Sequence, residues 1–385
     1  MGTSVNFIKN DAFVLCSNLE KVTTKDIGAW CEIQFGNEKA NPLFYAGHLF
    51  NDKDLEIKDV IIPNSITHIG SYAFYGYSLL KSIVIPNTVT SIGGYAFYKC
   101  ISLTSLEIPN SVTGIGSGAF EGCDNLMDLK LDCPEVGTWF SQMSSIKHVT
   151  IDNSVTTIGK EAFKDCNNMT HIQFGNSVTN IEYGAFDGCM SLTKVIVPDI
   201  AAWCGITFRK DYKGDYTSNP LFYAHHLYCD EETEITNLVI PNSVTSIGDG
   251  AFYGCSGLTS VEIPNSVSTI GNGAFDGCEN LEQVVSFIKM IFNINTNVFS
   301  DKTYLNATLY IPEGRRKAYE AATGWQKFVY MEEGVPDGIE DIKSERNDAI
   351  EVARYNSDGI VINAPVRGLN IIKYSNGTVK KEYVK

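Results

Sequence analysis

Residues 240–281 read IPNSVTSIGDGAFYGCSGLTSVEIPNSVSTIGNGAFDGCENL, and this stretch contains one motif twice in succession. The proline of Ile-Pro-Asn returns after 23 residues, and an Ala-Phe pair follows each proline at a constant distance. The same pattern occurs elsewhere in the chain. Its prolines are Pro63, Pro86, Pro109, Pro241 and Pro264, and its phenylalanines are Phe74, Phe97, Phe120, Phe163, Phe186, Phe252 and Phe275. A fixed period of this length is typical of stacked structural repeats.

The first part of each unit is predicted to be a strand. Val261 and Ile263 alternate with Ser260 and Glu262, which is the pattern of a strand with one buried face. Proline cannot donate to a sheet, so Ile-Pro-Asn ends the strand, and the glycine-containing stretch after it is predicted to form a compact arch. One unit cannot bury its own apolar face, whereas stacked units can. The sequence therefore predicts an α/β repeat solenoid, a superhelix with one continuous parallel sheet on its concave face and short turns or helices in the arches.

The units differ in length. Two long units, at 26–62 and 199–240, are copies that differ by a five-residue insertion, and a short unit spans only 20 residues, from Leu129 to its counterpart Val149. Residues 4–22 also align with the repeat, so the chain is expected to begin inside a unit. About twelve units are expected in all. Trp30 and Trp203 hold matched places in the long units, and we interpret them as core residues, because aromatic side chains bury the most surface.

The repeats are expected to form a single domain over residues 1–332, with a C-terminal cap at 305–332 that contains a strand, a helix and an aromatic-rich cover. Residues 333–348 are polar and charged, and are predicted to be a linker. Residues 349–385 contain turn signals such as Asn376-Gly377, and are predicted to form a small β segment.

The composition restricts the possible partners. The chain has 385 residues, 44% of them hydrophobic, and a formal net charge of -15. Binding to nucleic acid or to an anionic membrane requires clustered Lys and Arg, so neither is expected. No apolar run reaches the roughly 18 residues that a membrane span needs. The first residues read as repeat sequence rather than as a signal peptide, so we expect any leader to be absent from this chain.

The cysteines follow the repeat. Seven of the 11 occupy one column of the unit, and Tyr77 takes this place in one further unit. One cysteine per turn is not a zinc-ligand spacing. We interpret the column as small buried thiols; the alternative, disulfides between neighbouring units, suits parallel side chains badly. The column contains Cys16, Cys100, Cys123, Cys166, Cys189, Cys255 and Cys278.

The repeat motif IPxSVTxIGxxAFxxCxxL covers roughly residues 4–330 and resembles the BspA-like family of leucine-rich repeats. The resemblance implies a secreted or surface-displayed protein that adheres to host proteins or to other cells. The segment EVARYNSDGIVINAPVRGLNIIKYSNGTVKKEYVK, residues 351–385, resembles the C-terminal sorting tail of secreted proteins from Bacteroidetes, which implies export.

The outward residues of the predicted strands are the candidate binding residues, because they vary from unit to unit while the arch residues do not. Two apolar pairs, Ile61 with Val84 and Ile196 with Val239, are expected on either side of a polar centre. Exposed β-branched residues of this kind are either simple strand formers or part of a binding face. The candidates are Ile61, Val84, Asp128, Lys130, His148, His171, Gln173, Lys194, Ile196 and Val239.

Three functions remain open at this stage. The first is a binding module that recognises a protein, possibly a glycan, for example host extracellular matrix or another cell surface. The second is an architectural spacer without a specific ligand. The third is a metal-dependent enzyme, for which His148, His171 and Asp128 are the only candidate ligands; we interpret this group as a solvated polar patch, because open sheet faces seldom build the second shell of a metal site. No nucleotide-binding or hydrolase motif is present, no cofactor or metal is expected, and the protein is predicted to be a monomer.

Overall fold

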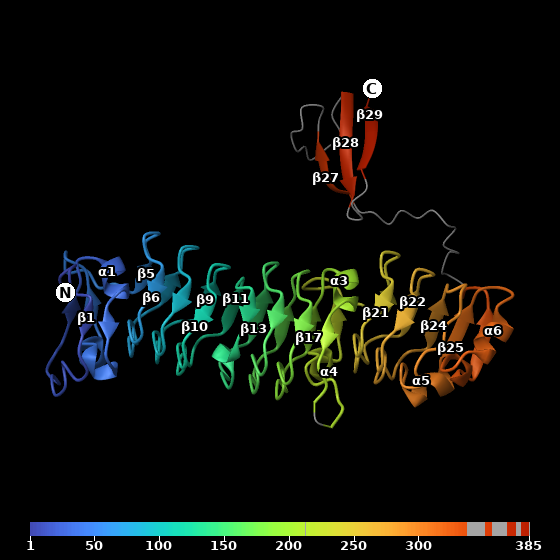
Figure 1. Ribbon diagram of the computed structural model, residues 1–385, viewed down its shortest axis with the longest axis horizontal. Coiled ribbons are helices and arrows are strands. Elements are labelled where there is room, and N and C mark those ends of the chain that lie inside the picture. The colour runs from blue at the N-terminus through green and yellow to red at the C-terminus, as the bar shows by residue number, and fades with distance from the viewer. Residues whose placement is uncertain (212, 337–350, 356–367, 375–378, 385) are drawn as a thin grey trace. The chain divides into compact units, whose positions relative to one another are not determined.

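The computed structural model describes residues 1–211, 213–336, 351–355, 368–374 and 379–384. The chain divides into two compact units, Met1–Glu333 and Gly334–Lys385. In the first unit the chain winds through successive turns that stack side by side (Figure 1). This arrangement confirms the predicted repeat solenoid.

Each turn contributes one strand to a parallel sheet, which we call the main sheet. Its strands alternate exposed and buried residues, as in Ser105–Ile108, where Leu106 and Ile108 face the core. The main-sheet strands are β2 (Val22–Thr23), β4 (Leu49–Phe50), β5 (Asp59–Ile61), β7 (Ser82–Val84), β9 (Ser105–Ile108), β11 (Asp128–Leu131), β13 (His148–Ile151), β15 (His171–Gln173), β17 (Lys194–Ile196), β19 (Leu227–Tyr228), β20 (Asn237–Val239), β22 (Ser260–Ile263), β24 (Gln283–Ser286), β25 (Thr308–Ile311) and β26 (Tyr330–Glu333).

The prediction of one continuous sheet is wrong. Strand pairing within the described part of the array forms separate blocks, with interruptions between β4 and β5, β7 and β9, and β19 and β20. Two of the interruptions follow β4 and β19, the extra two-residue strands of the long units. After each of them the chain forms a small hairpin, closed by the bridges Phe50–Glu56 and Tyr228–Glu234, before the next regular strand begins. The additional chain in the long units therefore separates neighbouring regular strands.

The arches contain a second row of parallel strands that sequence reasoning did not predict. Each strand has only two residues, as where Ser246–Ile247 pairs with Thr269–Ile270. The strands of this row are β1 (Phe7–Ile8), β3 (Gln34–Phe35), β6 (His68–Ile69), β8 (Ser91–Ile92), β10 (Gly114–Ile115), β12 (Glu135–Val136), β14 (Thr157–Ile158), β16 (Asn180–Ile181), β18 (Thr207–Phe208), β21 (Ser246–Ile247) and β23 (Thr269–Ile270).

Helices are short and occur in the long units, the short unit and the C-terminal cap. In the first long unit, the Asp26 carboxylate accepts hydrogen bonds from the amides of Gly28 and Ala29, and this cap begins α1. The helices are α1 (Ile27–Cys31), α2 (Leu43–Ala46), α3 (Ile200–Cys204), α4 (Leu221–Ala224), α5 (Asp301–Asn306) and α6 (Arg316–Ala321), with 3-10 turns η1 (Glu38–Ala40), η2 (Thr138–Phe140) and η3 (Trp325–Lys327).

The core consists of columns of identical side chains that stack from unit to unit. The rings of Phe97 and Phe120 are nearly parallel, with centroids 5.5 Å apart. Trp30 and Trp203 are buried, as expected, and their indole N–H groups donate to the carbonyl oxygens of Ala73 and Ala251. Large aromatic surfaces are thus buried with their polar atoms satisfied.

The cysteine column is also part of this core, and all the cysteines are free thiols. Cys123, for example, is buried beside Phe97 of the preceding unit. The prediction is wrong for Cys16, which is exposed. Cys16 lies in the first turn of the array, where Leu15 is also exposed, so this turn encloses little core.

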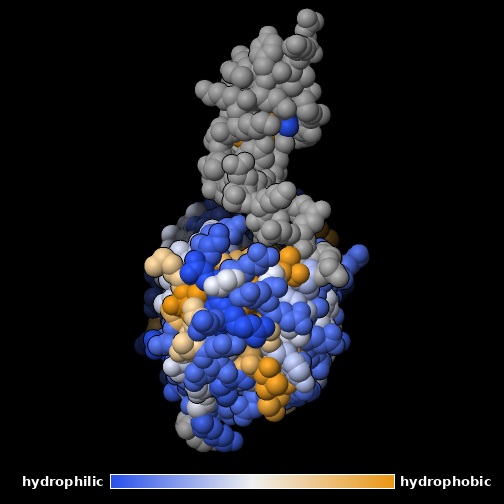
Figure 2. Space-filling view, turned by 90° about the vertical axis from the view of Figure 1, so that its right-hand side faces the viewer, coloured by the Kyte–Doolittle hydropathy of each residue, from blue (hydrophilic) through white to orange (hydrophobic). Residues whose placement is uncertain are grey.

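The C-terminal end of the array is covered by α6, η3 and β26. Tyr319 and Trp325 are buried beneath them with ring centroids 5.4 Å apart. Where this end is visible in Figure 2, its surface is mostly hydrophilic, with small separate hydrophobic patches. In the second compact unit, β27 (Glu351–Tyr355), β28 (Gly368–Tyr374) and β29 (Val379–Val384) form an antiparallel sheet. Most of the expected linker 333–348 lies outside the described residues.

Candidate functional site

The outward face of the main sheet carries an apolar pair in its N-terminal half. Ile61 in β5 and Val84 in β7 lie opposite each other in register, and they are 70% and 55% exposed. Each follows a buried residue of the same strand, so the pleat directs both side chains away from the core. The predicted pair is therefore present as two neighbouring apolar side chains in solvent.

A charged row continues from this pair along the same column. The Lys130 ammonium lies 2.8 Å from the Glu107 carboxylate and 3.7 Å from that of Asp152. The hydrogen bond with Glu107 is the largest cause that raises the pKa of Lys130. Lys130 is thus a positive charge held between two carboxylates on an open surface.

The two candidate histidines occupy the second outward column. Nδ1 of His148 lies 2.7 Å from the Asp128 carboxylate, and the rings of His148 and His171 are 5.2 Å apart in an edge-to-face arrangement. Nδ1 of His171 contacts the Thr170 hydroxyl at 2.7 Å. Partial burial, followed by the positive charge of Lys194, lowers the pKa of His171. Among the described residues no group of three or more His, Cys, Asp or Glu side chains is arranged to hold a metal ion.

A shallow hollow of about 340 Å³ lies between the apolar pair and the histidines. It brings together the predicted residues Asp128, Lys130 and His148, and Glu107 joins them. The lining residues are Ser82, Ile83, Ser105, Leu106, Glu107, Asp128, Leu129, Lys130, His148 and Thr150. These side chains come from four successive strands, β7, β9, β11 and β13, so the hollow is a product of the stacking itself.

The second apolar pair is not formed. Ile196 is only 2% exposed, whereas Val239 is 49% exposed. The two are not neighbours, because β19 lies beside β17 and places Tyr228 opposite Ile196. The hairpin after Tyr228 also contacts Lys194, whose ammonium donates to the backbone carbonyl of Glu231 at 2.5 Å and lies 4.9 Å from the centre of the Tyr228 ring. Gln173, in the adjacent strand, is half-buried.

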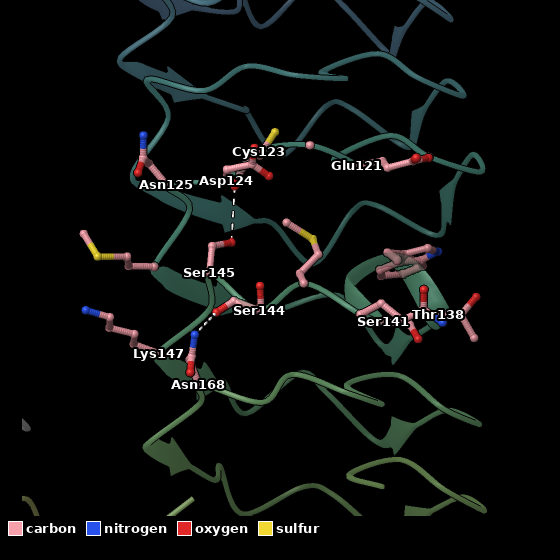
Figure 3. Close-up of a pocket in the computed structure, with 16 residues that line it drawn as sticks. Glu121, Cys123, Asp124, Asn125, Thr138, Ser141, Ser144, Ser145, Lys147 and Asn168 are labelled. Atoms are coloured by element: carbon pink, nitrogen blue, oxygen red, sulfur yellow. Dashed lines mark hydrogen bonds between the residues drawn. The ribbon is translucent and has the colours of Figure 1, made fainter. Parts of the chain in front are cut away.

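A larger hollow, of about 740 Å³, lies on the arch side of the short unit and was not predicted from the sequence. Figure 3 shows Glu121 on one side of it, and on the other side Thr138 of η2 and Ser141, which directly follows η2. Trp139 lines the hollow and is partly exposed. Its position was a usable signal, because the regular units have alanine where the short unit has Trp139, and the unit of Phe299 has the similarly small Val298 there.

Three solved structures are similar to this chain. A leucine-rich cell surface protein from Faecalibacterium prausnitzii is 25% identical, with a TM-score of 0.33, over 83% of this chain and 84% of that chain. A leucine-rich repeat protein from Bacteroides ovatus is 23% identical, with a TM-score of 0.33, over 72% and 81%. A leucine-rich repeat protein from T. pallidum is 21% identical, with a TM-score of 0.30, over 63% and 89%. The search of curated proteins finds no match.

Family membership follows from the repeats themselves. None of the helices in the described residues is both long and apolar enough to cross a bilayer. The family model for BspA-type leucine-rich repeat regions matches in 6 copies, at residues 47–138, 135–202 and 226–322, which together make up more than half of the chain. The chain belongs to the BspA-type leucine-rich repeat family.

Proposed function

We propose that the array is a binding module that recognises a protein through the outward face of the main sheet. The observation that carries this proposal is that the outward positions of the strands vary between units while the buried positions do not. Buried positions repeat from unit to unit, whereas the adjacent outward column changes from Ile61 and Val84 to Glu107 and Lys130. Packing restricts the buried positions, so the outward positions are free to encode a partner.

The chemistry of this face suits a protein ligand. Ile61 and Val84 offer apolar surface that a partner can bury, and buried contacts of this kind provide most of the binding energy at interfaces. The neighbouring charges of Lys130 and Asp128 favour a complementary polar partner and fix its register. The array has no need of moving parts for this task, since stacked repeats present a large surface ready-made.

We further propose that the protein acts at the cell surface or after secretion. The name of the Faecalibacterium prausnitzii structure places that protein at the cell surface. The division into an array at 1–332, a linker at 333–348 and a C-terminal segment at 349–385 with a role in sorting is part of the same proposal. Catalysis is not proposed, because the histidine group is open, and each of its rings already has a protein partner.

The test compares two matched variants. Ile61→Asp with Val84→Asp places charges in the apolar pair, while Met290→Asp places one on an even more exposed apolar residue outside the main-sheet strands. Proteins retained from extracellular-matrix extract by the parent array are identified, purified and titrated against each variant. We expect the double variant to bind at least about tenfold more weakly, a loss of ~1.4 kcal/mol, and Met290→Asp to bind as the parent does. Equal binding by all three proteins would exclude this face as the recognition surface, whereas a parent protein that retains nothing from the extract would favour a spacer role.

A further inference from the structure

The backbone ladder that joins regular arches is missing where the short unit follows a regular one, and also where the second long unit follows the arch of Gly184 and Phe186. In regular units three amides of one arch donate to the next arch, as Tyr95, Phe97 and Lys99 donate to the carbonyl oxygens of Ser117, Ala119 and Glu121. Within residues 1–211, all of which are described, the corresponding amides of Gly118, Phe120 and Gly122 have no hydrogen-bond acceptor. Gly118 and Gly122 are partly exposed, so their amides are available to solvent or to a ligand, whereas Phe120 is buried.

At the short unit the gap coincides with Trp139, a large side chain in the alanine column. The arches on either side place a fully buried alanine at this position, Ala119 before and Ala162 after. An indole does not fit the space of a methyl group, and the indole of Trp139 lies instead against Gly137, where an added Cβ would be 2.9 Å from the ring. The hollow of about 740 Å³ lies between the short arch and the preceding one, while Phe120 and Phe140 of these two arches still stack in the core with ring centroids 5.6 Å apart.

The walls of this hollow present both donors and acceptors. Gly118 and Gly122 line it with unpaired amides, and the indole N–H of Trp139 has no acceptor among the described residues, although the other three tryptophans each have one. Fixed hydrogen bonds hold one edge in place. Ser145 donates to the carbonyl oxygen of Cys123 at 3.2 Å, and Asn168 to that of Ser144 at 2.9 Å (Figure 3).

The charges of the lining select against an anionic ligand. Glu121 and Asp124 outnumber Lys147, so the lining is slightly negative, and one ammonium group offsets one of the two carboxylates. The lining is mainly polar, which disfavours a lipid, and Trp139 supplies its largest apolar surface. A molecule that suits these walls carries many hydroxyl groups, which both donate and accept, and also has an apolar face to lie on the indole.

We propose that this hollow is a binding site for a neutral saccharide, separate from the main-sheet face. One face of a sugar ring packs against Trp139, and its hydroxyl groups pair with the free amides of Gly118 and Gly122 and with the polar side chains of Thr138 and Gln142. The volume lies within the range of ~300–1,000 Å³ that is usual for small-molecule sites. The site exists once in the described array, because the described residues contain only one arch with tryptophan in the alanine column.

Tryptophan fluorescence tests the proposal directly. Trp30, Trp203 and Trp325 are buried, so acrylamide should quench Trp139 almost alone. The parent protein is first screened on a printed array of neutral oligosaccharides, and each saccharide that binds is titrated in solution. We expect a saturable change in emission and protection from acrylamide. The proposal would be overturned if none of the printed oligosaccharides bound saturably. It would also be overturned if a bound saccharide left Trp139 fully accessible to acrylamide.

Two variants then replace the special residues by those that the other arches carry. Trp139→Ala restores the column alanine, and Gln142→Gly restores the column glycine at a residue with φ of 65°. Calorimetry should show about tenfold weaker saccharide binding for Trp139→Ala and a smaller loss for Gln142→Gly, with parent affinity for the control Met190→Ala. Saccharide binding that survives in Trp139→Ala would contradict the assignment. The variants leave the main-sheet face intact, so this result is independent of the protein-binding test.

Discussion

The thiol of Cys123 donates a hydrogen bond of 3.1 Å to the carbonyl oxygen of Phe97, in the preceding unit. Cys100, Cys166, Cys189 and Cys278 make the same bond to the phenylalanine one unit earlier. The cysteine column thus links successive arches without any disulfide. A thiol fits here because it is small, apolar and still able to donate.

The first prediction concerns thiol reactivity. Burial raises the pKa of the Cys123 thiol to about 12, and the thiolate is the reactive form, so buried cysteines should be inert. Only Cys16, which is exposed, and Cys229, which is partly exposed, should react in the native protein, whereas all 11 should react after unfolding. Alkylation followed by peptide mass spectrometry measures both states. Modification of Cys123 in the native state at the rate of Cys16 would contradict the buried column.

The second prediction concerns the phenylalanine column. Phe163 stacks between Phe140 and Phe186, with centroid distances of 6.3 and 5.5 Å. Phe163→Ala should lower the free energy of unfolding by ~3–5 kcal/mol, because it removes a buried ring and leaves a cavity. The control Met190→Ala alters an exposed side chain and should change it by less than about 0.5 kcal/mol. Urea denaturation followed by circular dichroism compares the two variants.

The third prediction compares the effect on stability of the same substitution at Ile196 and at Val239. Ile196→Gln places an amide in a buried site opposite Tyr228 and should cost roughly 2–5 kcal/mol of folding free energy. Val239→Gln changes a half-exposed residue and should be nearly neutral. Thermal unfolding of the two variants gives the comparison. Equal melting temperatures would mean that β19 does not cover Ile196 in solution.

The fourth prediction concerns His171. Its pKa lies below the ordinary value of 6.5, first because of burial and second because of Lys194. The folded state therefore binds fewer protons than the unfolded state just below pH 6.5, and the stability contributed by neutral His171 is lost as the pH falls through that window. Lys194→Gln should raise the pKa of His171 but leave it below 6.5, because the larger cause remains. NMR titration of the ring protons measures the shift, and Lys210→Gln is the control.

The sequence predicts the regular units well because their period is strict and their buried residues alternate. Leu106 and Ile108 are inside, and Glu107 is outside, as the pattern requires. The pattern does not predict β19, because Leu227–Tyr228 is too short to show alternation. Because β19 lies beside β17 and covers Ile196, the predicted apolar pair of Ile196 and Val239 is wrong. The second row of strands was missed for a similar reason, since two residues leave no periodic signal.

The hollow at the short unit was missed because the units were compared by their strands. The strand from Asp128 to Leu131 is regular, and the shortening falls in the arch after it. Aligning the arches instead places Trp139 in the alanine column, where its size already predicts a displaced backbone. The unpaired amides of Gly118 and Gly122 depend on three-dimensional spacing and are visible only in the structure.

The parallel register has a consequence for how such molecules change over generations. Val261 pairs with Leu238 behind it and Val284 ahead of it, so each residue meets its own counterpart on both sides. Duplicating or deleting one regular unit recreates the same contacts, and no new interface must evolve. The short unit is different, because Trp139 fits only beside an arch that leaves it room. In an array that gains or loses regular units, such a unit stays distinguishable from its neighbours and marks one position along the stack.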